Sequence, residues 1–303
     1  MLVFAASDKG GTGRSVTSCN IAYRLSMTGR DVAYLDFDFG SPTAGAIFEI
    51  AKIDRGTPTT GLHECIAEGA TDPDQFDVRS HSDRQELRAL QAGAGRLVLF
   101  PGDLGGAEFG STPEGIARCV DLFQRLDNEF DICVVDLSAG RSHAVGMSLA
   151  AMATPELRTV PVRWVVFHRW TRQHIVAAAN LVTGEHGLLK MGADVSHDPE
   201  RLANAIKFVR TAVPELRSPT AAARPTQARW LQRADRELNE LARRYNVGQD
   251  LLLGSTPVEP VLQWREQLII DSDVTDNIAN GETVAAFNQL VKDLLDDGEW
   301  EGQ

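Results

Sequence analysis

Residues 7–15 of this chain read Ser7-Asp8-Lys9-Gly10-Gly11-Thr12-Gly13-Arg14-Ser15. The segment follows the apolar run 2–6 and precedes an amphipathic pattern that predicts a helix from Val16 to Thr28. A strand, a glycine-rich loop and a helix in this order form the setting in which a loop binds phosphate. Glycines allow successive backbone N–H groups to turn toward one anion, and the positive end of the following helix faces the same anion. The segment therefore predicts a phosphate-binding loop.

The segment departs at two positions from the common phosphate-loop pattern, G-x-x-x-x-G-K-[ST]. Asp8 stands where the first glycine is expected, Arg14 stands where the lysine is expected, and an extra lysine, Lys9, precedes the glycines. The pattern resembles the deviant Walker A motif of the ParA/MinD family of P-loop ATPases, with Arg14 as the exception. In that family the opening lysine reaches the nucleotide of a dimer partner, and Lys9 matches it. The alternative is a glycine-rich turn without a ligand.

Two carboxylates follow the strand that the apolar run 31–35 predicts. Asp36 and Asp38 are two residues apart, so in an extended chain they lie on one side. They fall beyond the carboxyl edge of a parallel sheet, where α/β proteins bind ligands. The resemblance implies that Asp38 orients the attacking water, with Asp36 beside it. A solvated turn is the alternative, and the position one helix and one strand after the glycine loop argues against it.

The apolar run 130–137 contains Asp136 near its end, which is the form of a Walker B element whose carboxylate holds Mg²⁺ or its bound water. Later strands are predicted at 162–167, 206–209 and 251–257. The resemblance implies catalytic roles for Lys9, Arg14 and Asp38. It implies nucleotide contacts from Gly10, Gly11, Thr12, Gly13, Arg14, Ser15, Val16, Arg210, Thr256 and Pro257. It implies magnesium contacts from Ser15, Asp36, Asp38 and Asp136.

Two later segments keep alternative interpretations. The basic and aromatic segment 168–174 either contacts the nucleotide or a partner, or begins a solvated helix. A helix predicted over 224–245 carries six arginines: Arg224, Arg229, Arg233, Arg236, Arg243 and Arg244. These either contact DNA phosphates without sequence preference or form a solvated face with the interleaved acids.

Composition limits the function classes. The net charge of −12 argues against a globally basic nucleic-acid binder. The four cysteines have no C-x-x-C spacing, as expected of reduced thiols in the cytoplasm. No run of eighteen apolar residues is present and the first strand begins at residue 2, so we expect a soluble cytoplasmic protein without a signal peptide. In the acidic C-terminal tail Lys292 is the only base, so we expect no direct membrane binding.

The fold implied is α/β: a doubly wound, mostly parallel sheet with helices on both faces, the fold of a P-loop NTPase, in one domain over 1–303. The resemblance implies ATP or ADP with Mg²⁺, a nucleotide-dependent homodimer, and a switch that positions or partitions a cargo of DNA or protein through an unidentified partner. Arginine is longer and wider than lysine, so we expect Arg14 to leave nucleotide binding intact and to make ATP hydrolysis slow or absent.

Two other functions remain alternatives. One is a non-hydrolysing, nucleotide-dependent regulatory module. The other is an iron–sulfur carrier of the nitrogenase iron-protein type, which shares the fold and requires paired exposed cysteines. Cys119 falls in a predicted helix and Cys133 in the interior of a predicted strand, which argues against the carrier.

Overall fold

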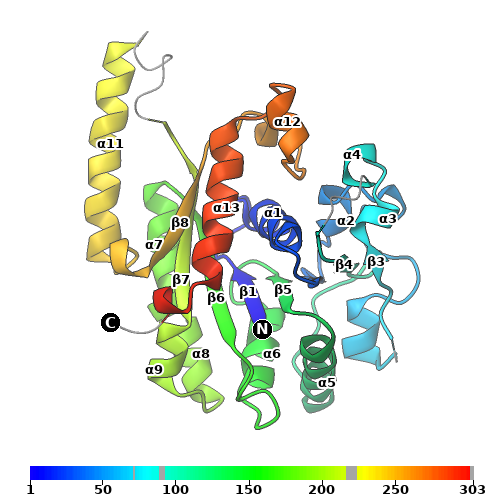
Figure 1. Cartoon of the computed structure of the whole chain (residues 1–303). Helices are drawn as coiled ribbons and strands as arrows, with labels where there is room; N and C mark the ends of the chain where they lie inside the picture. Colours follow the sequence, from blue (N-terminus) through cyan, green and yellow to red (C-terminus); the bar gives the residue numbers. More distant parts are fainter. Residues whose placement is uncertain (71, 89–92, 216–223, 301–303) are drawn as a thin grey trace.

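A computed structural model of the chain describes residues 1–70, 72–88, 93–215 and 224–300. Its centre is an eight-stranded sheet with the strand order β3-β4-β2-β5-β1-β6-β7-β8, shown in Figure 1. Every neighbouring pair is parallel except β3 and β4, which are antiparallel. The strands are β1 (Leu2–Ala6), β2 (Val32–Phe37), β3 (Phe76–Asp77), β4 (Leu97–Phe100), β5 (Ile132–Leu137), β6 (Val162–Arg169), β7 (Ile206–Val213) and β8 (Leu252–Pro257).

The helices connect these strands and cover the sheet. Helices of ten or more residues follow β1, β4, β5, β6 and β7, as expected where parallel strands need crossover connections, and α13 follows the last strand. The helix predicted from Val16 is α1, which begins two residues earlier, so that Arg14 belongs to its first turn. The helices are α1 (Arg14–Met27), α2 (Ala44–Ile47), α3 (Val78–His81), α4 (Gln85–Arg88), α5 (Pro113–Glu129), α6 (His143–Met152), α7 (Arg172–Thr183), α8 (Leu188–Asp194), α9 (Pro199–Asn204), α11 (Pro225–Arg244), α12 (Asp271–Thr275) and α13 (Gly281–Leu295).

The sheet is apolar on both faces, and each face has its own core. In β1 the side chains of Leu2, Phe4 and Ala6 belong to one core, whereas Val3 and Ala5 belong to the other. Helices α5 to α9 cover the first face, and α1 and α13 lie side by side over the second (Figure 1). Strands buried on both faces read as continuous apolar runs, which is the pattern that the sequence shows. The predicted fold class is confirmed.

The strand order brings the glycine loop and the acidic strand ends together. Strand β5 lies between β1 and β2, so the connection from β1 through α1 to β2 crosses over β5. In register, Asp136 of β5 lies beside Ala5 of β1 and Asp36 of β2. The carboxyl ends of these three parallel strands therefore meet at one point of the sheet edge, which is where open α/β sheets bind ligands.

No helix in the described ranges is both long enough and apolar enough to cross a membrane.

His168 gives a pH-dependent contribution to stability. It lies in β6 and is 1% exposed, its Nε2 has no hydrogen-bond partner within the described residues, and burial lowers its pKa to about 4. Below pH 6.5 the unfolded chain gains a proton at this residue that the folded chain does not accept until near pH 4. Acidification from pH 7 to 4 should therefore cost the wild type roughly 3 kcal/mol of unfolding free energy at this residue, and His168→Gln should remove that part of the loss.

Urea denaturation at a series of pH values measures this effect. The exposed His186, replaced in His186→Gln, is the matched control and should leave the pH dependence of the wild type unchanged. Equal acid sensitivity in the wild type and in His168→Gln would mean that His168 accepts a proton in the folded state.

Candidate functional site

The glycine loop joins the end of β1 to the start of α1. Gly11 and Gly13 have φ angles of +72° and +77°, which residues with a side chain rarely adopt. No atom of the described residues lies within 4 Å of the position that a Cβ atom would take on Gly10 or Gly11, so those residues leave the space over the loop open. No side chain of the described residues caps α1, which leaves the N–H groups of its first turn available to an anion.

A cavity of about 190 Å³ lies over this loop. Its lining includes the predicted loop residues Lys9, Gly10, Gly11, Thr12, Gly13, Arg14, Ser15 and Val16, together with Asp38. Six residues that were not predicted as nucleotide or magnesium contacts also line it: Ser7, Ser41, Thr43, Ile47, Ala139 and Glu266. The structure therefore gathers the predicted phosphate loop and one of the two predicted strand-end aspartates around one cavity.

Arg14 turns its side chain into the protein. Its Nε donates to Asp136 Oδ1 at 2.5 Å, and its Nη2 donates to Asp38 Oδ2 at 3.0 Å. Nη2 also donates to the hydroxyl oxygen of Ser15 at 3.2 Å, and Nη1 to that of Ser7 at 3.4 Å. Only 6% of the Arg14 side chain is exposed. One guanidinium group thus binds three of the four residues that the resemblance assigned to magnesium.

The charges of this cluster stabilise one another. Burial opposes the charge on Arg14, but the carboxylates of Asp136 and Asp38 outweigh burial, so the pKa of the guanidinium is raised. Burial raises the pKa of Asp38, and the Arg14 charge partly offsets that rise. Arg14 is therefore a permanent cation in the middle of the site.

Asp36 has a different environment. One of its oxygens accepts hydrogen bonds from the backbone N–H groups of Thr43 and Ala44, both at 2.9 Å, and the residue is 1% exposed. Burial, and then repulsion by Asp136, raises the pKa of Asp36 to about 7. Asp36 does not line the loop cavity. Its carboxyl group fixes the chain between β2 and α2, and Asp38 alone of the two reaches the cavity.

The predicted magnesium ligands do not have the arrangement that the ion requires. Mg²⁺ requires oxygen donors in near-octahedral geometry. In the described part of the chain no group of three or more His, Cys, Asp or Glu side chains is arranged to hold a metal ion. Ser15, Asp38 and Asp136 each have an oxygen bonded to Arg14, and Asp136 Oδ2 has no partner among the described residues. With Arg14 in this position the residues present do not fit Mg²⁺.

The predicted adenine-edge residues do not line this cavity. Arg210, on β7, stacks over the ring of Trp170 at 3.9 Å from its centre. Thr256 and Pro257 end β8, and none of the three lines the loop cavity. The structure therefore does not bring these predicted nucleotide contacts together with the glycine loop.

Thr211 supports the loop instead. Its hydroxyl group donates to the carbonyl oxygen of Thr12, and its Cβ lies 3.7 Å from the position of a Cβ on Gly13. Neighbouring side chains of a strand point to opposite faces, so Thr211 and Arg210 face different surroundings. The only sequence signal for Thr211 was its place on the strand beside Arg210, and the loop that it contacts lies about two hundred residues earlier.

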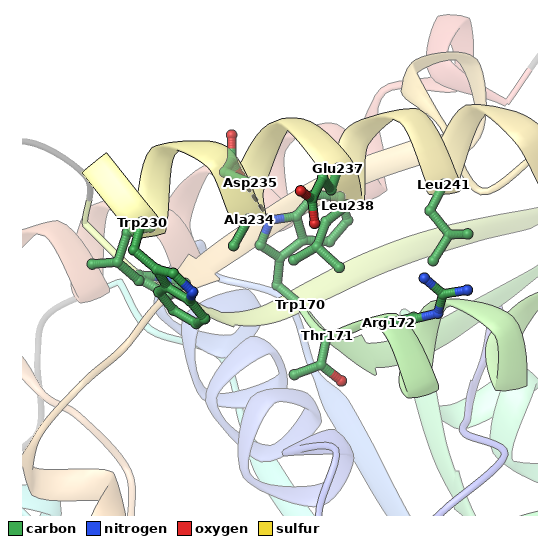
Figure 2. Close-up of a pocket in the computed structure, with 11 residues that line it drawn as sticks. Trp170, Thr171, Arg172, Trp230, Ala234, Asp235, Glu237, Leu238 and Leu241 are labelled. Carbon is green, nitrogen blue, oxygen red and sulfur yellow. Dashed lines mark hydrogen bonds between the residues drawn. The ribbon is translucent and has the colours of Figure 1, made fainter. Parts of the chain in front are cut away.

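A second cavity, of about 360 Å³, lies between α11 and the segment that joins β6 to α7 (Figure 2). At its base Trp170 is 5% exposed, and its indole N–H donates to Asp235 at 2.8 Å. Trp230, also in the lining, is 63% exposed. The segment 168–174, for which contact with a ligand or partner and a solvated helix start were the alternatives, thus packs in part against α11.

Helix α11 has two different faces. Its apolar face packs Leu238, Leu241 and Ala242 near Trp170. Its other face carries arginines at spacings of four, three and seven residues, which place them on one side of a helix: Arg229, Arg233, Arg236 and Arg243. All six arginines of 224–244 are exposed, and within the described residues none of them forms an ion pair. The exposed Glu240, four residues after Arg236, lies on the same face, which therefore carries a net positive charge.

Comparison with known proteins gives a family and a set of partial relatives. The family described as "CobQ/CobB/MinD/ParA nucleotide binding domain" matches residues 3–213. An uncharacterized ATP-binding protein from Methanocaldococcus jannaschii is 25% identical over 166 residues, which cover 53% of this chain and 55% of that protein. An iron–sulfur cluster carrier protein from Pseudomonas fragi is 43% identical over 51 residues, 17% of this chain and 18% of that protein. The match spans about half of the first relative and less than a fifth of the second.

Solved structures share the fold over almost the whole chain. MinD from Pyrococcus horikoshii OT3 in complex with Mg-ADP has a TM-score of 0.52 and 14% identity, covering 98% of this chain and 96% of that one. A putative plasmid partition protein from Borrelia burgdorferi B31 bound to AMPPNP has a TM-score of 0.60 and 15% identity, covering 97% and 98%. A McdA variant from Cyanothece in complex with ATP has a TM-score of 0.59 and 13% identity, covering 97% and 95%.

The thiol groups bear on the iron–sulfur alternative. All four cysteines, Cys19, Cys65, Cys119 and Cys133, are buried and free. Burial raises the pKa of Cys65 to about 11 and that of Cys133 to about 12. A carrier needs thiolates exposed at a protein surface, so this arrangement argues against cluster carriage by the chain.

Removal of the Arg14 side chain should destabilise the fold. In Arg14→Ala the carboxylate of Asp136, which is 1% exposed, loses its cation, and an uncompensated buried charge costs about 3–5 kcal/mol. Urea denaturation measures the loss. The control is Arg141→Ala, since Arg141 pairs with Asp8 at 3.2 Å near the surface and should cost less than about 1 kcal/mol. Losses of similar size in the two variants would show that Arg14 does not neutralise Asp136.

Proposed function

Since the chain belongs to the CobQ/CobB/MinD/ParA nucleotide-binding domain family, we propose that it is a nucleotide-dependent molecular switch and that the whole of 1–303 acts as one domain. The observation that carries the proposal is the open glycine loop, with Gly11 and Gly13 at positive φ and an uncapped helix behind it. Such a loop binds the phosphates of ATP or ADP through backbone N–H groups. Gly10 to Val16 supply these contacts, while adenine contacts by Arg210, Thr256 and Pro257 remain a prediction from the resemblance.

The proposed switch assembles two copies of the chain around nucleotide. Lys9 lines the loop cavity, is half-buried, and within the described residues takes part in no ion pair. It is therefore available to the nucleotide of a second copy, as the resemblance implies for a lysine at this place. One of the similar solved structures is a MinC:MinD complex from Aquifex aeolicus, and others are plasmid partition proteins from Borrelia burgdorferi. Because these similar structures include a protein complex and plasmid partition proteins, we propose that this chain also has a protein partner and a cargo of DNA or protein.

Hydrolysis in the proposed switch is slow or absent. Catalysis of phosphoryl transfer depends on cations and dipoles aimed at the transferred phosphoryl group. The Arg14 charge is directed at Asp38 and Asp136, and the Asp38 carboxylate that would orient water is bonded to Arg14. A second candidate function is a regulatory module that binds nucleotide and does not hydrolyse it. The contacts of Arg14 with Asp38 and Asp136 favour this candidate.

Gel filtration with ATP, with ADP and without nucleotide tests the switch. The wild type should elute as a dimer with ATP and as a monomer otherwise, and phosphate release should stay near background. Lys9→Ala should bind ATP and remain monomeric, because the charge that crosses the interface is gone. The exposed Lys52, replaced in Lys52→Ala, is the control and should behave as the wild type. A wild type that binds neither nucleotide would refute the proposed function.

DNA contact through the basic face of α11 is tested separately. Fluorescence anisotropy should show sequence-independent binding of duplex DNA that weakens as salt is raised. The triple variant Arg229→Ala/Arg233→Ala/Arg236→Ala should weaken binding and reduce the salt slope by about 0.9 for each lost phosphate contact. The exposed Arg88 and Arg96 lie outside α11 and serve as control substitutions. If the triple variant binds DNA as the wild type does, these arginines do not contact DNA and form a solvated face.

A further inference from the structure

The guanidinium group of Arg14 bonds the residue types that hold magnesium in a P-loop ATPase. In such ATPases the ion is bound by the hydroxyl group of the loop Ser or Thr and by the Walker B aspartate. Here the corresponding groups are Ser15 and Asp136, and Arg14 donates to both of them, as it does to Asp38. An arginine of the chain itself therefore bonds one oxygen of each of these residues.

This contact is built into the protein rather than made at its surface. Arg14 is 6% exposed and Asp136 is 1% exposed, so neither is free to reorient in water. The guanidinium fork donates to two carboxylates at once through Nε and Nη2, whereas a lysine side chain is shorter and carries a compact charge. A divalent cation on the same oxygens would stand beside a permanent positive charge and be repelled by it.

We propose that Arg14 replaces the magnesium ion, so that this loop binds nucleoside di- and triphosphates without a divalent cation. The inference rests on the proposed function, because it concerns how the same loop holds nucleotide. The phosphates are bound by the backbone N–H groups of the loop and by the N-terminus of α1, neither of which needs a metal. The positive charge of Arg14 offsets part of the negative charge of Asp38 and Asp136, which would otherwise repel the phosphates.

Isothermal titration calorimetry with ATP and ADP, each in Mg²⁺ and in EDTA, tests the inference. The wild type should bind with affinities that agree within about twofold between the two conditions. Arg14→Lys should bind at least about tenfold more tightly in Mg²⁺ than in EDTA, because lysine releases Ser15 and Asp136 to the ion. Electron paramagnetic resonance of Mn²⁺ gives an independent readout: Mn²⁺ should be immobilised with nucleotide by Arg14→Lys and not by the wild type.

Arg141→Lys is the matched control, since Arg141 lies beside the loop and pairs with Asp8. It should bind nucleotide as the wild type does in both conditions. Wild-type binding that requires Mg²⁺ would overturn the inference and leave the proposed function standing. Metal-independent binding in both the wild type and Arg14→Lys would show that Arg14 is not what replaces the ion. No wild-type binding in either condition would overturn the proposed function itself. The wild-type titrations decide the matter even where Arg14→Lys does not fold.

Discussion

The buried ion pair between Arg14 and Asp136 constrains both the fold and the site. Asp136 lies on β5, between β1 and β2, and its carboxylate is buried. An isolated buried carboxylate is very unfavourable, so the fold needs a cation at this point. That cation comes from the first turn of α1 and therefore also fixes where the glycine loop ends and the helix begins. In this chain the stability of the sheet edge and the geometry of the phosphate loop depend on the same contact.

The acids at this edge are stabilised in different ways. Asp36 and Asp136 are neighbours in register on adjacent strands, which would place two negative charges side by side. Arg14 forms an ion pair with Asp136. Asp36 instead accepts hydrogen bonds from backbone N–H groups, and burial raises its pKa to about 7. Asp38, one step beyond, shares the Arg14 charge from a partly exposed position. Residues of the chain thus stabilise the acids at this edge, and Arg14 is bonded to oxygens of Asp38 and Asp136 that a metal ion would use.

The fold could be predicted because the motifs at the strand ends carry the family resemblance that implies it. The continuous apolar runs agree with that fold, since parallel strands buried on both faces have this pattern. The glycine loop was equally predictable, since Gly11 and Gly13 occupy conformations that few other residues adopt. The direction of the Arg14 side chain was not predictable, because it depends on Asp136, 122 residues later. The second cavity likewise depends on the hydrogen bond from Trp170 to Asp235. Contacts at long sequence separation leave no periodic signal.

A site that contains its own cation changes how a nucleotide switch must work. A ligand shifts a conformational equilibrium only through its different affinity for the two states. In P-loop ATPases much of that difference comes from the γ-phosphate and its magnesium ion, which hold the switch segments together. Here Arg14 holds Asp38 and Asp136 in place before nucleotide arrives, so those acids give little difference between ATP and ADP. In the switch that we propose, the discrimination then falls to a group outside the cluster, and the proposed group is Lys9 of a second copy, which lines the loop cavity.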